Sequence, residues 1–207
     1  MRFYSTALLL AFAFTLSAQT TYKLTYADTL TVRLPASVLN NMTLSISGNL
    51  PDSLKKQVDS ALRKQFSMKP LVQLQERKVT ATADSTIVEI DQSKVVGNGV
   101  RVPLAYHRMV MKGGKITGVF ASDRTSMDLP PDEDRRFLAT GGKQIILNYE
   151  CAAYKSGLVT IWVTRALPSS INPGIKNVDI PGAILGFELE SGMSTMISKV
   201  QLIQPAN

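Results

Sequence analysis

The chain has 207 residues, of which 44% are hydrophobic and 19% are charged, enough for one globular domain with an apolar core. Its formal net charge is +7, but the basic residues are scattered singly or in pairs such as Lys55-Lys56, without interleaved aromatic residues. This pattern argues against nucleic acid as a partner. The excess of positive charge instead favours anionic surroundings, such as a membrane surface contacted peripherally or acidic glycans.

Residues 1–18 have the three parts of a secretory signal peptide. An early arginine precedes an apolar run of about ten residues (7–16), and small residues lead to an expected cleavage after Ala18. A membrane-spanning helix needs about 20 apolar residues, so the run is too short to act as an anchor. We therefore predict an exported domain, residues 19–207, without a transmembrane segment, in the periplasm or at the outer membrane of a Gram-negative bacterium.

The start of the predicted mature domain has the period of two that is typical of strands. Within residues 22–34, Tyr22, Leu24 and Tyr26 share one side. Residues 42–48 alternate in the same way. Both segments are therefore predicted to be strands.

Residues 51–67 change to helical spacing. The apolar side chains that recur on one side are Leu54, Val58, Ala61, Leu62 and Phe66. Pro51 suits the first turn, and Asp52 lies near the N-terminal end, where acidic residues stabilise helices. Because the apolar stripe is narrow, we expect this helix to pack across a sheet.

Strand patterns resume after the predicted helix. They cover residues 86–90, 101–111, 115–122, 143–154, 157–167, 183–190 and 194–203. Gly113-Gly114 and the short segments 155–157 and 191–193 are turn sequences, and Pro130-Pro131 marks a turn that allows a short helix. Short turns between strands predict a mainly β (α+β) fold: a curved antiparallel sheet or half-barrel meander with one packed amphipathic helix.

The chain lacks the usual catalytic and cofactor motifs. His107 is its single histidine and Cys151 its single cysteine, which argues against a multi-histidine zinc site, a Ser-His-Asp triad and an internal disulfide. No phosphate-binding glycine loop or nucleophile elbow occurs. We predict no catalytic residue, cofactor or metal. A glycosidase-like pair among the strand carboxylates stays open, because the fold decides which of them meet: Glu89, Asp91, Glu150, Glu188 and Glu190.

The stretch "NVDIPGAILGFELESG" (177–192) places Pro181-Gly182 inside an apolar run. In physical terms the pair predicts a type II turn, in which proline presets the first central residue and glycine supplies the positive φ of the second.

The order of motifs around this turn resembles the GLPGLI family of exported Bacteroidetes proteins, over about residues 137–203. The matching segments are "ILNYECAAY", "IWVTRALP", "INPGIKNV" and "DIPGAIL". The matching positions are Tyr149, Cys151, Trp162, Thr164, Pro168, Pro181, Gly182 and Ile184. Asp179 and Ala183 depart from the family pattern. The resemblance implies an envelope location and a β-rich fold in which these positions are structural, but no biochemical activity.

The sequence suggests more sheet than one helix can cover, since a helix is about 10 Å wide and neighbouring strands are about 4.8 Å apart. An uncovered apolar sheet needs a ligand, a partner or closure into a barrel. We therefore expect a non-enzymatic envelope protein that binds a lipid, a lipoprotein or another apolar ligand on a curved sheet. The alternative is an interaction module that docks an outer-membrane partner through its edge strands.

Overall fold

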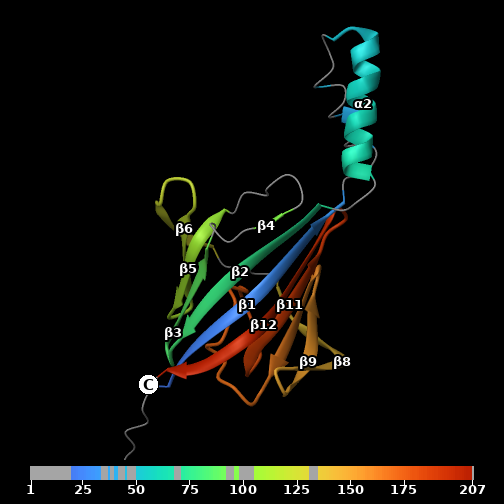
Figure 1. The fold of residues 1–207 in the computed structure, drawn as a ribbon. Helices are drawn as coiled ribbons and strands as arrows, with labels where there is room; N and C mark the ends of the chain where they lie inside the picture. Colours follow the sequence, from blue (N-terminus) through green and yellow to red (C-terminus); the bar gives the residue numbers. More distant parts are fainter. Residues whose placement is uncertain are drawn as a thin grey trace, which may run out of the picture.

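A single antiparallel sheet of twelve strands dominates the computed structural model, which describes residues 20–33, 37, 40–41, 45, 50–67, 71–91, 96–97, 105–130 and 135–206 (Figure 1). The strands are β1 (Thr21–Val32), β2 (Leu71–Ala81), β3 (Ser85–Ile90), β4 (Val96–Gly97), β5 (Tyr106–Lys112), β6 (Lys115–Phe120), β7 (Ser126–Leu129), β8 (Leu138–Ile146), β9 (Tyr149–Ser156), β10 (Val159–Thr164), β11 (Ala183–Glu190) and β12 (Ser194–Ala206).

The strand order is β7-β6-β5-β3-β2-β1-β12-β11-β10-β9-β8, with the short β4 beside β2. Within the described residues β7 and β8 are the two edges, so the sheet is not closed. It is strongly curved, and its two halves meet where β1 pairs with β12 (Figure 1). The prediction of a mainly β, antiparallel fold is confirmed.

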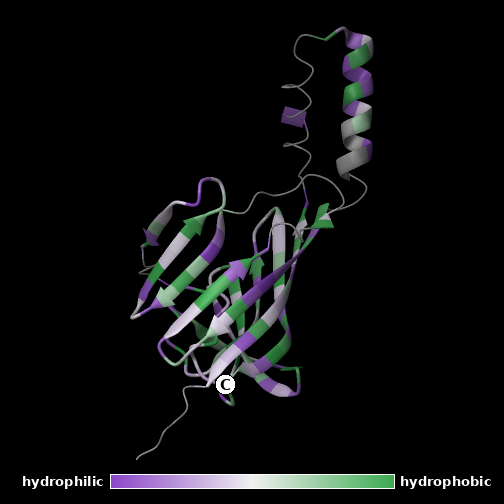
Figure 2. Cartoon of the chain, turned by 60° about the vertical axis from the view of Figure 1, so that its left-hand side comes forward, coloured by the Kyte–Doolittle hydropathy of each residue, from purple (hydrophilic) through white to green (hydrophobic). Residues whose placement is uncertain are grey.

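The inner side of the sheet follows the alternation read from β1. Leu24, Tyr26 and Asp28 are buried on one side, whereas Lys23 and Ala27 on the other are exposed. Figure 2 shows apolar and polar residues alternating along the strands in this way. Asp28 is the exception to the pattern, because it is a charged residue in a buried row.

The helix α2 (Asp52–Ser67) lies where the sequence placed it but not against the surface that we expected. It extends beyond one end of the sheet instead of covering the concave side (Figures 1 and 2). Leu54 on its apolar stripe is 44% exposed. The prediction that this helix packs on the sheet is therefore wrong. No helix among the described residues is both long and apolar enough to cross a membrane.

Three other predictions are either corrected by the structure or concern residues outside the described ranges. The strand expected over residues 143–154 is a hairpin, because Leu147 and Asn148 adopt positive φ angles (46° and 69°) and reverse the chain between β8 and β9. The strand expected over 42–48 lies outside the described residues except for Ser45, which is helical. The signal peptide, residues 1–18, also lies outside them.

Candidate functional site

A segment without regular secondary structure, residues 165–182, connects β10 to β11 and lies across the concave side of the sheet; we call it the crossing segment. Its Leu167 and Ile171 are buried in an apolar cluster with residues of β1, β2, β3 and β12. Its Ile175 and Val178 pack against a second cluster on β10 and β11. The crossing segment thus occupies the surface that we expected a helix to cover.

Asn172 folds the middle of the crossing segment into a tight turn. Its Oδ1 accepts hydrogen bonds from the backbone N–H groups of Gly174 (2.9 Å) and Ile175 (2.7 Å), and its Nδ2 donates to the Ile175 carbonyl (2.9 Å). Gly174 has a φ of +104°, a region that favours glycine, and it lies against Met109 of β5. The turn directs the carbonyl of Pro173 at β2.

Asp28 of β1 and Arg77 of β2 form a buried ion pair beneath this turn. Asp28 Oδ2 accepts hydrogen bonds from Arg77 Nη2 (2.8 Å), Arg77 Nε (3.0 Å) and Gln75 Nε2 (2.9 Å). Asp28 Oδ1 accepts one from Ser198 Oγ of β12 (2.6 Å), and the Arg77 guanidinium lies 5.2 Å from the centre of the Phe187 ring. Asp28 is 1% and Arg77 is 6% exposed. Charges removed from water to this extent depend on such partners.

Hydrogen bonds to its backbone carbonyls attach the crossing segment to both halves of the sheet. Arg77 Nη1 donates to the Pro173 carbonyl (2.5 Å), and Thr86 Oγ1 of β3 donates to the Ser170 carbonyl. At the other end, the Ile184 N–H donates to the Ile171 carbonyl (2.9 Å). These hydrogen bonds and the buried apolar side chains of the crossing segment hold it on the sheet.

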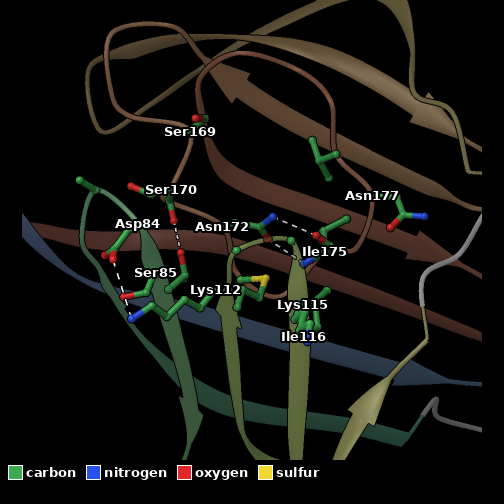
Figure 3. Close-up of a pocket in the computed structure, with 16 residues that line it drawn as sticks. Asp84, Ser85, Lys112, Lys115, Ile116, Ser169, Ser170, Asn172, Ile175 and Asn177 are labelled. Carbon is green, nitrogen blue, oxygen red and sulfur yellow. Dashed lines mark hydrogen bonds and ion pairs between the residues drawn. The ribbon is translucent and has the colours of Figure 1, made fainter.

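An open pocket of about 440 Å³ lies between the crossing segment and the ends of β3, β5 and β6 (Figure 3). At its rim, Lys112 Nζ lies 3.9 Å from Asp84 Oδ2. A second pocket of about 300 Å³ shares Lys115 and Ile116 with the first and adds Leu129 of β7. The larger pocket is lined mostly by polar residues, whereas the smaller one is mainly apolar, with Ile116, Leu129 and Pro130 in its wall.

Several positions of the GLPGLI-like motifs fix the ends of the crossing segment. Gly182 has a φ of +125°, in agreement with the positive φ predicted for it. A Cβ there would lie 2.8 Å from the carbonyl carbon of Thr164, and closer still to its oxygen. The Ile184 carbonyl accepts a hydrogen bond from Tyr26 Oη (2.6 Å), and burial raises the pKa of Tyr26, which keeps this hydroxyl protonated.

The other motif positions lie in or beside the apolar core. Cys151 is fully buried, its Sγ donates to the Tyr149 carbonyl (3.5 Å), and burial raises the pKa of its thiol. Tyr149 and Trp162 are partly buried and pack against the larger apolar cluster. The Pro168 carbonyl accepts a hydrogen bond from the Ile171 N–H (3.1 Å). These contacts are packing and backbone hydrogen bonds within the fold.

The carboxylates that the sequence left open are not brought together as a buried pair in the described part of the chain. Glu89, Glu150 and Glu190 are exposed, whereas Asp91 and Glu188 are half-buried. Glu150 accepts a hydrogen bond from Lys143 Nζ (2.7 Å), and each group shifts the pKa of the other toward its charged form. His107 Nδ1 lies 3.1 Å from the Phe120 carbonyl, on a strand separate from Cys151. No three metal-ligating side chains gather among the described residues.

The polar cluster around Arg77 was missed from the sequence because β2 was not recognised as a strand. Its buried row contains the polar Gln73, Gln75 and Arg77, whereas Leu74 between them is 50% exposed. In this part of β2 the buried positions are polar and the exposed position is apolar, which is the reverse of the pattern from which strands are usually predicted. The sequence did contain a signal for this strand: polar residues recur at every second position and are followed, in the same alternation, by Val79 and Ala81.

Comparison with solved structures finds partial matches at low identity. A structure of PNGF-II has a TM-score of 0.48 and 11% identity over 91% of this chain; the match spans 28% of that longer chain. A LolA superfamily protein from Nitrosomonas europaea has a TM-score of 0.37 and 10% identity, and the match covers 91% of this chain and 87% of that one. Neither a protein-family model nor a curated protein matches the chain.

Proposed function

We propose that this protein is an exported, non-enzymatic envelope protein, a divergent relative of the GLPGLI family, that binds the acyl chain of a lipid or lipoprotein between the curved sheet and the crossing segment. The observation that carries the proposal is that the apolar concave side is covered by a segment without regular secondary structure. Every strand pairing of the sheet is formed without that segment.

The crossing segment can therefore move without breaking the strand ladder. Its displacement uncovers the apolar cluster that Leu167 and Ile171 now fill. Uncovered apolar surface costs about 25 cal/mol per Å², and an acyl chain of similar area recovers that free energy. Local opening of a segment outside the strand ladder requires less free energy than unfolding of the whole sheet. The smaller, mainly apolar pocket beside the crossing segment gives such a chain a place to enter.

The first test is mass spectrometry of an organic extract from mature protein, residues 19–207, purified without detergent from an exporting bacterial host. We expect a lipid or another acylated species in a stoichiometric amount. An empty, stable and monodisperse protein would contradict the proposal.

A second test locks the crossing segment. Cysteines replacing Thr86 and Ser170, whose side chain and backbone are already in hydrogen-bond contact, place a disulfide across the segment and β3. We expect the oxidised variant to lose binding of an apolar fluorescent dye and the reduced variant to regain it. The controls are the two variants that carry only one of the introduced cysteines beside the buried Cys151. Equal binding in both redox states would show that the segment does not need to move.

A second candidate function, strand addition by an envelope partner, is favoured by β8. Within the described residues β8 pairs only with β9, and it exposes Leu138 (72%) and Ile145 (76%). Unpaired edges with apolar side chains accept strands from other chains, and charged residues block this. A complex with an envelope protein that is lost in Ile145→Lys, while lipid retention is unchanged, would favour this function over the first.

A further inference from the structure

We infer that Arg77 binds a neutral carbonyl group of the ligand, of the kind found in the ester of an acylated glycerol, at the position that the Pro173 carbonyl now occupies. The inference rests on the proposed function and specifies which chemical group of the ligand is recognised.

The donors of Arg77 are divided between the sheet and the crossing segment. Nε and Nη2 donate to Asp28 of the neighbouring strand, so these bonds persist when the segment moves. Nη1 donates to the Pro173 carbonyl at 2.5 Å, so this bond is lost when the segment moves. A buried donor without an acceptor is unfavourable. A pure hydrocarbon leaves Nη1 unpaired, whereas a ligand with a carbonyl oxygen restores the bond.

The charge balance around Arg77 selects a neutral acceptor over a carboxylate. The guanidinium is already neutralised by Asp28, whose other hydrogen-bond donors, Gln75 and Ser198, are uncharged. A ligand carboxylate on Nη1 would place two anions around one cation in a site removed from water, and the repulsion would disfavour it. An ester or amide carbonyl, like that of Pro173, accepts the same hydrogen bond without adding charge.

The surroundings of Arg77 suit the chain attached to such a carbonyl. The Phe187 ring lies beside the guanidinium, and the larger apolar cluster, which includes Leu24, Tyr26 and Val79, continues along the same concave side. The carbonyl on Arg77 would therefore fix the position of an acyl chain along the sheet.

The test is displacement of the apolar dye N-phenyl-1-naphthylamine from full mature protein by three matched competitors: dodecane, methyl dodecanoate and dodecanoate. Since a hydrogen bond to a charged group contributes enough to shift affinity by roughly 10- to 100-fold, we expect methyl dodecanoate to bind that much tighter than dodecane, and tighter than dodecanoate. Equal binding of ester and hydrocarbon, or tighter binding of the carboxylate, would overturn the inference while leaving the proposed function intact. A protein that binds none of these molecules would overturn both.

The assigned residue is tested with the double variant Asp28→Leu/Arg77→Met, which removes the ion pair without leaving one charge buried alone. We expect the ratio of ester to hydrocarbon affinity to fall to about 1. The matched control is Arg136→Met, which removes an exposed arginine and should keep the ratio of the original protein. A ratio that survives in the double variant would overturn the role of Arg77. Should the double variant not fold, the competitor series on the unmodified protein still decides the inference.

Discussion

Replacing Gly182 with alanine should destabilise the protein by about 1–5.6 kcal/mol. The backbone φ of +125° is a region that L-residues adopt at a cost of about 1–3 kcal/mol. The new Cβ would also lie 2.8 Å from the Thr164 carbonyl carbon and 3.1 Å from Val163 Cγ1. Relieving such overlap by a backbone shift costs about 1–3 kcal/mol more. The lower entropy of the unfolded chain returns about 0.4–1 kcal/mol.

Guanidinium denaturation followed by the fluorescence of Trp162, the single tryptophan, measures this loss. Two alanine variants separate its causes. Gly157→Ala has a positive φ (+55°) but no neighbouring atom within 4 Å, so after the same entropy gain it should cost about 0–1.6 kcal/mol. Gly192→Ala has neither constraint and should stabilise the protein by about 0.4–1 kcal/mol. If Gly182→Ala were no more destabilising than Gly157→Ala, the overlap with Thr164 would be irrelevant and the reasoning refuted.

Three further variants test other parts of the fold. Leu147→Asn should stabilise the protein by about 0.5–1 kcal/mol in urea denaturation, because asparagine tolerates the left-handed φ of +46° better than leucine; a destabilised variant would contradict the turn geometry. Tyr26→Phe should cost about 1–3 kcal/mol, because the buried Ile184 carbonyl loses its donor. Folding raises the pKa of Tyr26 above its usual value of 10.0, so the unfolded chain releases this proton first and stability falls as the pH rises above that value. The phenylalanine variant should lose this part of the alkaline dependence of stability. An unchanged dependence of stability on pH would refute the assignment to Tyr26. Asn172→Ala removes the bonds that shape the central turn, so hydrogen–deuterium exchange should rise in residues 165–182 while β2 stays protected; equal exchange in both proteins would contradict that role.

Much of the strand pattern could be predicted from the sequence, because buried and exposed side chains alternate where one side of a strand is apolar. The segment 183–190 coincides with β11, and the Gly113-Gly114 turn has the two positive φ angles of a tight hairpin. The reversal at Leu147 gave no such signal, since leucine is uncommon at positive φ. Pairing of β8 with β9 imposes that conformation, and pairing is a tertiary property.

The candidate site was less predictable than the strands, because its charged residues lie where apolar ones are expected. Asp28 interrupts the buried row of β1, and Arg77 sits in a strand whose exposed side carries Leu74. Each of these buried charges is balanced by the other, but the two residues are 49 positions apart in the sequence. The covering of the sheet by an irregular segment was also hidden, because its Pro, Gly and Asn residues are typical of surface loops.

The pairing of β1 with β12 has a consequence for how the chain folds. Asp28 and Ser198, which meet at the centre of the sheet, are 170 positions apart, so the central seam cannot close until nearly the whole domain has been synthesised. Contacts between such distant positions form slowly, because a long loop must be closed first. Until then the chain has half of a sheet with an unpaired central strand, which favours a loosely folded state. For the export that we propose for this protein, such a delay would be an advantage, because translocation across a membrane requires an unfolded substrate.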